Sequence, residues 1–298
     1  MNTFELARSV SELRARGFTS FDCENMMSAV RIAINGLNHI LDDPDARRLF
    51  TIPEVQYPRD ELGEPYEMGI LPKKSGEEKL PDEMGFFDRA AGRTDDDPLK
   101  DRFHYTPKLL HLLHSTDRGR HAEFFAAVES FNRQALALVS ELAGEFDRKK
   151  AAHPGVWGYP GTLLGRMRNA VAITRLLRYE KAYAKVHRDR DGFSVHHYSS
   201  HPGLYLFDKK KVAHTIDETN PRSLAVFTGE KFWAVTRGRF GTGVPHGVSS
   251  LGKSSVASRI IPRYAIVTFI HINLSAADVG WLHEHLNQIE IDAALFKM

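Results

Sequence analysis

Three side chains in the second half of the chain are spaced to bind one metal ion. His187 and Asp189 are two residues apart in a segment that alternates like a β-strand, and His246 follows far downstream. Side chains at positions i and i+2 of a strand point to the same side of a sheet, about 6–7 Å apart. A second imidazole from another strand would complete two histidines and one carboxylate on one face of a metal. This ligand set is typical of non-haem Fe(II) enzymes that use dioxygen, because it leaves coordination positions open.

Residues 247–254 read GVSSLGKS and match the phosphate-loop pattern G-x-x-x-x-G-K-S/T. In that loop, backbone N–H groups bind phosphate at the start of a following helix. Pro262 would end such a helix after about two turns, and too little chain remains for the further βα units of a nucleotide-binding sheet. We therefore interpret the segment as a surface loop between two strands. Nucleotide binding through Gly247–Ser254 stays a distant alternative.

The composition excludes several classes of protein. The 298 residues carry 40 Lys and Arg against 38 Asp and Glu, a net charge of +2, which lacks the basic excess typical of nucleic-acid and membrane-surface proteins. The single cysteine, Cys23, excludes an internal disulfide and a cysteine-built zinc site. No apolar run approaches the roughly 20 residues that span a bilayer, and the N-terminus has charges where a signal peptide would be apolar. We expect a cytoplasmic protein with no nucleic acid and no membrane as partners.

Helices are expected before and after a block of strands. The first forty residues have a helical pattern, with Thr19 and Asp22 spaced as a helix cap. Apolar residues three and four apart predict one long helix over residues 124–146. Ser275 and Asp278 predict the cap of a closing helix. The expected strands are 173–179, 183–189, 193–198, 203–207, 224–227, 232–236 and 263–272.

Strands of this number and spacing favour a sandwich, jelly roll or barrel over a parallel sheet, so the expected fold class is α+β. We expect a single catalytic domain over residues 1–298. Its parts are a mainly helical region at 1–150 with an irregular segment at 51–105, a β-barrel core at 155–273 and a C-terminal helix at 275–298. The irregular segment is either a lid or an ordered wrapping over the barrel.

Several short motifs occur in an order that resembles one enzyme family. The sequence is similar to the isopenicillin N synthase-like, 2-oxoglutarate- and Fe(II)-dependent oxygenases over about residues 100–272. The segments that carry the resemblance are Phe103–Pro107, Arg175–Tyr179, His187–Asp189, Phe193–Ser194, Gly203–Leu204, Thr228–Glu230, Ala234–Gly238, His246 and Pro262–Ala265. The resemblance implies the family's double-stranded β-helix, or jelly-roll barrel, with a helical region before it and one helix after it.

The resemblance also implies the roles of individual residues. His187, Asp189 and His246 would hold Fe(II) and form the catalytic centre. Arg263 would bind the far carboxylate of 2-oxoglutarate, the co-substrate that is consumed together with dioxygen when a C–H bond is oxidised. An arginine on an inward strand face among apolar residues requires an anion; alternatively, it pairs with a surface acid at the mouth of the strand. Tyr179 could donate its phenolic hydroxyl to the same carboxylate or to the substrate.

Two departures from the family's pattern bear on the co-substrate. Ala265 stands where the family has a serine whose hydroxyl binds the far carboxylate of 2-oxoglutarate, and Gly247 replaces an arginine that commonly follows the second histidine. Ala265 keeps open an Fe(II)-dependent oxidase or cyclase of the same fold that uses no 2-oxoglutarate. Asp189 is retained, which disfavours halogenation, because halogenating relatives lose this carboxylate.

The substrate pocket is expected beside the metal. Arg175, Ser194 and His196 lie on expected strands next to the metal ligands and are the candidate substrate-binding residues. Enzymes of the family hydroxylate, desaturate or cyclise amino acids, peptides and natural-product intermediates. The resemblance therefore implies a small organic substrate of this kind, as in secondary metabolism. A jelly-roll binding module without a metal is the remaining alternative class.

Overall fold

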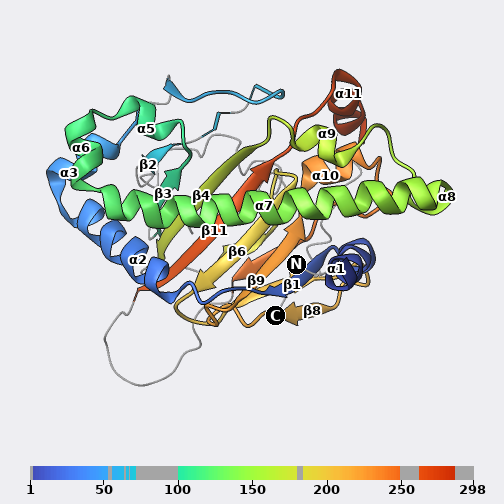
Figure 1. The fold of residues 1–298 in the computed structure, drawn as a ribbon, viewed down its shortest axis with the longest axis horizontal. Helices are drawn as coiled ribbons and strands as arrows, with labels where there is room; N and C mark the ends of the chain where they lie inside the picture. Colours follow the sequence, from blue (N-terminus) through green and yellow to red (C-terminus); the bar gives the residue numbers. More distant parts are fainter. Residues whose placement is uncertain are drawn as a thin grey trace.

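Two antiparallel β-sheets pack against each other at the centre of the protein (Figure 1). The computed structural model describes residues 3–52, 56–63, 65–66, 68–71, 100–179, 184–248 and 262–285. Within these residues the larger sheet has the strand order β1-β9-β6-β11-β4-β3-β2, and the smaller sheet has the order β5-β10-β7-β8. The strands are β1 (Phe18–Asp22), β2 (Gly69–Leu71), β3 (Lys100–Tyr105), β4 (Val171–Tyr179), β5 (Ala184–His187), β6 (Phe193–Ser199), β7 (Leu204–Phe207), β8 (Ala213–Thr215), β9 (Ser223–Thr228), β10 (His246–Val248) and β11 (Arg263–His271).

The inner faces of the two sheets share one apolar layer. Phe18 and Phe227 of the larger sheet pack in the same buried cluster as Leu204, Leu206 and Val248 of the smaller sheet. Side chains alternate between the two faces of a strand, so every second residue of each sheet points into this interior. The arrangement confirms an α+β fold in which a two-sheeted barrel follows a helical region.

The outer face of the larger sheet is covered by α7 (Ala122–Ala152), which runs across the strands (Figure 1). Its buried apolar residues follow steps of three and four, as the sequence predicts, and include Phe124, Val128, Phe131, Ala135, Leu138, Leu142 and Phe146. A polar chain joins the helix to the sheet beneath it. Asn132 Nδ2 donates to Thr174 Oγ1 at 3.2 Å, and Thr174 Oγ1 lies 2.9 Å from Thr268 Oγ1.

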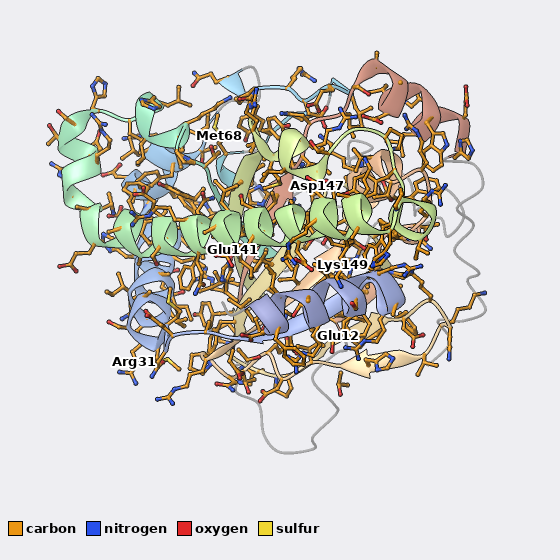
Figure 2. The ribbon with its side chains drawn as sticks, turned by 45° about the vertical axis from the view of Figure 1, so that its right-hand side comes forward. Glu12, Arg31, Met68, Glu141, Asp147 and Lys149 are labelled. Carbon is orange, nitrogen blue, oxygen red and sulfur yellow. The ribbon has the colours of Figure 1, made fainter. Side chains whose placement is uncertain are left out.

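The other helices are α1 (Thr3–Arg16), α2 (Met27–Asp42), α3 (Pro44–Phe50), α5 (Leu109–Leu112), α6 (Ser115–Arg120), α8 (Pro154–Trp157), α9 (Leu163–Met167), α10 (Glu230–Val235) and α11 (Ala276–His285). Near the end of α7, Asp147 (Figure 2) accepts hydrogen bonds from the Tyr159 hydroxyl at 2.6 Å and from the Leu163 N–H at 2.8 Å. This carboxylate therefore ties the α8–α9 segment to α7. None of the helices in the described part of the chain combines the length and apolar character that a membrane span requires.

The first forty residues are not wholly helical, so the prediction of a cap at Thr19 and Asp22 is wrong. Gly17, with φ of +90°, follows α1, and the chain then continues as β1, in which Phe18 lies opposite Phe227 of β9. Glycine adopts this left-handed conformation without a steric penalty. Thr19 donates its hydroxyl to Glu12 at 2.6 Å instead of capping a helix. Burial of aromatic side chains on the sheet therefore outweighs the local capping pattern.

Two further predictions of local structure fail. The apolar run at 232–236, predicted as a strand, belongs mostly to α10, whose six residues are all buried. A short run that is apolar on every side does not distinguish a buried strand from a buried helix. The segment 51–105, predicted as irregular, contributes β2 and β3, and β3 pairs with β4 so that Phe103 lies opposite Leu176.

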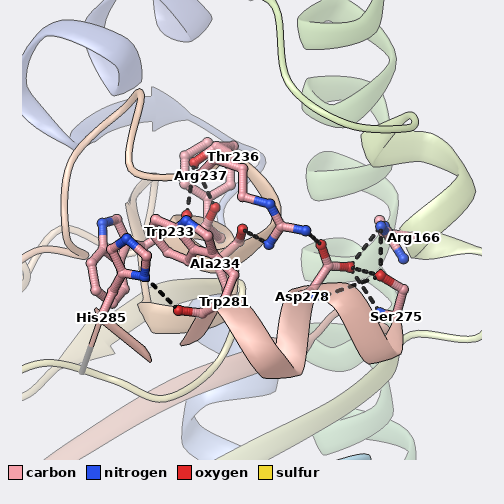
Figure 3. Close-up of polar contacts among 10 residues, drawn as sticks. Arg166, Trp233, Ala234, Thr236, Arg237, Ser275, Asp278, Trp281 and His285 are labelled. Carbon is pink, nitrogen blue, oxygen red and sulfur yellow. Dashed lines mark hydrogen bonds and ion pairs between the residues drawn. The ribbon is translucent and has the colours of Figure 1, made fainter. Parts of the chain in front are cut away.

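The closing helix is held by one buried carboxylate (Figure 3). Asp278, whose side chain is fully buried, lies 2.6 Å from Arg166 Nη2 and 2.9 Å from Arg237 Nη2. It also accepts the N–H of Ser275 at 2.8 Å, while the Asp278 N–H donates to Ser275 Oγ at 3.2 Å. The predicted cap of α11 is confirmed, and the same carboxylate also links α9 and the end of α10 to α11. The described part of α11 buries Leu282, and the rest of the predicted helix at 275–298 lies outside the described residues.

We expect Asp278→Asn to lower the free energy of unfolding by about 3 kcal/mol, because it leaves two guanidinium groups next to a neutral side chain in a buried site. Urea unfolding monitored by circular dichroism measures this change. The matched control is Asp45→Asn, which removes an ion pair with Arg48 whose two side chains are 86% and 83% exposed, and which should cost less than about 1 kcal/mol. Equal effects of the two substitutions would contradict the assigned role of Asp278.

Candidate metal centre

His187 and His246 lie directly opposite each other on neighbouring strands. β5 and β10 pair antiparallel with these two residues in register, and their ring centroids are 4.3 Å apart. Residues that lie opposite each other in an antiparallel pair project to the same face. The register alone therefore brings the two imidazoles together. The side chain of His187 is 29% exposed and that of His246 is 8% exposed, so the site opens to solvent on the His187 side.

Asp189 follows β5 and turns its carboxylate toward both imidazoles. Its Oδ1 is 3.7 Å from His187 Nε2, and its Oδ2 is 3.6 Å from His246 Nε2. These separations are too long for good hydrogen bonds, whereas a metal bound at about 2.0–2.2 Å from each donor atom fits between groups spaced in this way. All three donor groups lie within 4.8 Å of one another, which holds for no other set of three His, Cys, Asp or Glu side chains among the described residues. The three predicted ligands therefore come together and fit one ion.

The imidazole of His246 is oriented by its own backbone. Its Nδ1 lies 3.1 Å from the carbonyl oxygen of Val244, and a carbonyl can only accept, so Nδ1 carries the hydrogen. In the neutral ring, the lone pair of Nε2 then lies on the side of Asp189. The Phe227 ring packs 4.7 Å from the His246 ring, measured between centroids. A neutral imidazole fixed in one tautomer by a carbonyl is the usual condition of a metal-binding histidine.

A hydroxyl group couples the carboxylate of Asp189 to a second one. Ser194 donates to Asp189 Oδ2 at 2.5 Å, and its Oγ lies 2.9 Å from Asp191 Oδ2. Burial and the charge of Asp189 raise the pKa of Asp191. Burial also acts to raise the pKa of Asp189, but His246, His187 and Ser194 outweigh it, so that this pKa lies below its ordinary value. Since the hydroxyl has only one hydrogen, the consistent arrangement has protonated Asp191 donating to Ser194, which donates to ionised Asp189.

The turn between β9 and α10 holds the loop that carries Asp189. The backbone N–H groups of Glu230 and Lys231 donate to the carbonyl oxygens of Asp189 and Asp191, each at 2.9 Å. Gly229 permits this approach, because a Cβ at that position would lie 2.3 Å from Asp191 Oδ1 and 2.7 Å from the Asp189 carbonyl oxygen. The segment Thr228–Glu230, one of those that carry the family resemblance, thus forms a turn and helix start that fixes the ligand loop.

Part of the segment 51–105 packs beside the site. Lys231, whose side chain is 1% exposed, lies 2.8 Å from Asp60 Oδ2 and 3.2 Å from Glu61 Oε2. The ring centroid of Tyr66 is 5.1 Å from that of His271, the last residue of β11. These contacts fit the interpretation of an ordered wrapping over the barrel for residues 60, 61 and 66. Residues 72–99 lie outside the described part of the chain.

Arg263 is bound by a carboxylate of its own chain. Its Nη2 lies 2.6 Å from Glu218 Oε2 and donates to Ser199 Oγ at 2.8 Å, while its Nε donates to the carbonyl oxygen of His201 at 3.1 Å. The side chains of Arg263 and Glu218 are 3% and 0% exposed. Arg263 therefore pairs with an acid of the chain, as the alternative interpretation supposed, but the acid is buried in the barrel and does not lie at its surface.

The candidate substrate-binding residues have different surroundings. Ser194 is fully buried and bonded to the two carboxylates described above. Arg175 lies on β4 with its guanidinium carbon 4.5 Å from the centroid of the Phe269 ring, and its charge helps to lower the pKa of Asp189. His196 Nε2 lies 3.2 Å from Ser199 Oγ and belongs to the cluster around Arg263. Tyr179 ends β4 opposite Arg263, but its side chain lies outside the described residues.

Sequence reasoning missed Glu218, Ser199 and Asp191. Asp217 and Glu218 are neighbours of similar type, and no pattern in the sequence distinguishes the exposed one from the buried one. The only available signal was the requirement of Arg263 for an anion. Ser199 could not be assigned because an irregular register between β11 and β6 brings it opposite Ala265.

The phosphate-loop pattern begins inside a strand. Gly247 lies in β10 opposite Tyr205 of β7, and a Cβ at Gly247 would be 2.6 Å from the Tyr205 hydroxyl oxygen. Val248 ends the same strand, and residues 249–254 lie outside the described part of the chain. A phosphate loop instead follows its strand. The glycine is accounted for by close packing in the smaller sheet.

No family model matches the sequence, and no curated protein matches it significantly. The structure is similar to a solved protein from Shewanella oneidensis described as an oxygenase, with 15% identity over 97% of each chain and a TM-score of 0.64. It also resembles the rice dioxygenase for auxin oxidation, with 16% identity over 96% of this chain and 91% of that one and a TM-score of 0.59. A full-length protein from Neurospora crassa, solved in complex with alpha-KG, has 13% identity, coverages of 96% and 92% and a TM-score of 0.60. These likenesses establish a shared fold, and the predicted double-stranded β-helix is confirmed.

We expect Ser194→Ala to weaken divalent metal binding by about 10- to 100-fold, because it removes the hydroxyl that orients Asp189. Isothermal titration calorimetry with Co(II) under anaerobic conditions measures the dissociation constant. Ser20→Ala, at an exposed position of β1, is the control and should leave that constant unchanged. Metal affinities that are equal in the two variants would show that Ser194 does not position the ligand.

Proposed function

We propose that the protein is a mononuclear non-haem Fe(II) enzyme that uses dioxygen to oxidise a small organic substrate. The observation that carries this proposal is the convergence of His187, Asp189 and His246 at distances that suit one ion. Two imidazoles and one carboxylate leave positions open for dioxygen and for a second ligand. The proposal treats residues 1–298 as one catalytic domain, because β1 and β3 complete the sheet that contains β6 and β11.

The residues of the chain have separate tasks in this proposal. His187, Asp189 and His246 would hold the ion, which supplies one-electron redox chemistry and a binding site for dioxygen. Ser194 keeps the carboxylate of Asp189 in one orientation and, with Asp191, holds a proton next to it. Phe227 and the buried barrel wall exclude water from the His246 side. Substrate would enter from the more exposed His187 side, past Arg175.

The first candidate for the co-substrate is 2-oxoglutarate. It is supported by the fold shared with the Neurospora crassa protein, which was solved in complex with alpha-KG. The balanced reaction converts 2-oxoglutarate, dioxygen and a substrate R–H into succinate, carbon dioxide and R–OH. In this candidate Arg263 and Tyr179 would bind the far carboxylate, and Arg175, Ser194 and His196 would face the substrate.

The second candidate is an oxidase or cyclase that uses no 2-oxoglutarate. It is favoured by one observation, the buried ion pair in which Glu218 already binds Arg263. Here the substrate would supply four electrons and four protons, which reduce dioxygen to two water molecules while new bonds form within the substrate. Succinate measured after incubation with Fe(II), ascorbate, 2-oxoglutarate and candidate substrates separates the two, because the oxidase would produce none.

The cytoplasmic location stays a prediction.

We expect one Fe(II) per chain to bind in an anaerobic titration, and His187→Ala or His246→Ala to weaken the binding more than about 100-fold, beyond the loss typical of a residue that only orients a ligand. His153→Ala, at an exposed position after α7, is the matched control. Affinity should fall as the pH is lowered below neutrality, because protons compete with the metal for both imidazoles.

Two results would contradict the proposed function. One is the absence of bound iron at neutral pH in the folded parent protein. The other is an affinity that neither histidine substitution changes relative to His153→Ala, which would locate any bound iron elsewhere on the chain.

A further inference from the structure

A carboxylate-binding site inside the barrel is already filled by the chain itself. Glu218 Oε2 lies 2.6 Å from Arg263 Nη2, and Glu218 Oε1 accepts the backbone N–H of Leu204 at 2.5 Å. Both oxygens therefore have a donor, one from each sheet. The Glu218 side chain is completely buried, so the carboxylate is shielded from water. An ion pair in such surroundings persists because each charge depends on the other for its compensation.

The hydroxyl expected at position 265 is supplied from the neighbouring strand. Ala265 of β11 lies opposite Ser199 of β6, and Ser199 Oγ is 2.8 Å from Arg263 Nη2. Arginine and serine thus stand next to each other, as in a site built for a carboxylate, although they come from different strands. Glu218 occupies the position in which a ligand carboxylate would meet the guanidinium.

This filled site lies close to the metal ligands. His246 of β10 is opposite Leu206 of β7, and Leu204, whose N–H binds Glu218, is two residues further along β7. Two residues of a strand correspond to about 6–7 Å. His196 Nε2 lies 3.5 Å from Glu218 Oε2, and burial together with the charges of Arg263, His197 and His246 lowers the pKa of its imidazole. Glu218 and His246 thus contact the same short segment of β7.

We propose that Glu218 takes the place of the second carboxylate of a dicarboxylic 2-oxo acid, so that this protein selects against 2-oxoglutarate at its metal site. The inference rests on the proposed function and makes Glu218 the residue that determines the class of co-substrate. The ligand that completes the metal site carries no far carboxylate. This ligand is either a 2-oxo acid with an uncharged tail or the substrate that undergoes oxidation.

The buried charges and the hydrogen bonds of Glu218 both support this selectivity. One guanidinium cannot compensate two carboxylates in a buried site, so an entering 2-oxoglutarate would have to displace Glu218. Displacement would break the pair with Arg263 and the hydrogen bond from Leu204, and would leave the Glu218 carboxylate buried without partners. A ligand that ends in a methyl group meets no such cost. A second carboxylate on the ligand therefore does not raise its affinity for the parent protein.

A pair of ligands tests the proposal on the parent protein. 2-Oxopentanoate and 2-oxoglutarate have the same five-carbon chain and differ only in the second carboxylate. Calorimetric titrations of the Co(II)-loaded protein under anaerobic conditions give their dissociation constants without turnover. We expect 2-oxoglutarate to bind no tighter than 2-oxopentanoate. Binding of 2-oxoglutarate about tenfold or more tighter, the gain expected from a charged hydrogen bond to Arg263, would overturn the proposal.

Two substitutions of Glu218 extend the test. Glu218→Ala opens the site and releases Arg263, so the affinity for 2-oxoglutarate should rise about tenfold or more, while that for 2-oxopentanoate should change less than about twofold. Glu218→Gln keeps the volume and the acceptor for Leu204 but removes the charge, and should shift the ratio of the two affinities toward 2-oxoglutarate by about threefold or more. Asp217→Ala, at the exposed neighbouring position, should leave the ratio at its parent value. Ratios in both Glu218 variants equal to that of Asp217→Ala would overturn the proposal.

The melting temperature of the metal-free protein gives a test of this inference that does not depend on the proposed function. In metal-free Glu218→Ala, acetate can replace the missing carboxylate, so it should raise the melting temperature in a saturable manner and restore part of the stability lost. Metal-free Asp217→Ala should not respond. If no variant binds metal but acetate restores Glu218→Ala, the proposed function fails and the site at Arg263 stands. If metal binds normally but acetate has no effect on folded Glu218→Ala, the inference about Glu218 fails alone.

Discussion

The candidate site depends on the register between β5 and β10. His187 and His246 are direct cross-strand partners, and a slip of one residue would turn one imidazole to the other side of the sheet. This register is supported from both sides, because β10 also pairs with β7, where His246 lies opposite Leu206. Gly247 continues the strand where a larger residue would meet Tyr205. The two nitrogen ligands are thus positioned by backbone pairing, and Asp189 is added by a loop that backbone hydrogen bonds hold to residues 229–231.

Buried charges in this protein are compensated within the chain, and this organises the barrel interior. Asp278 joins three helical segments through two arginines, and Lys231 holds residues 60 and 61 against α10. Near the metal ligands, Asp191 and Asp189 are joined through one hydroxyl. The pair of Glu218 and Arg263 follows the same rule. The guanidinium of Arg263 is therefore already compensated by a carboxylate of the chain.

Patterns that depend on local spacing were sufficient for much of the fold and for two of the three candidate metal ligands. The steps of three and four along α7 and the cap at Ser275 and Asp278 are local, and both predictions are confirmed. The spacing of His187 and Asp189 is also local, whereas His246 required the resemblance to a family. The failures have tertiary causes: residues 18–22 form a strand because they pair with β9, and the fully buried residues 232–235 form a helix although their apolar pattern fits a strand equally well. Glu218 could not be found, since its importance comes from contacts with residues distant in the sequence.

Anomalous X-ray scattering at the iron edge, from crystals grown anaerobically with Fe(II), locates a bound iron ion. We expect one peak per chain, located between the Nε2 atoms of His187 and His246 and the carboxylate of Asp189. A difference map without a peak at that position, or with iron bound only to other side chains, would contradict this expectation.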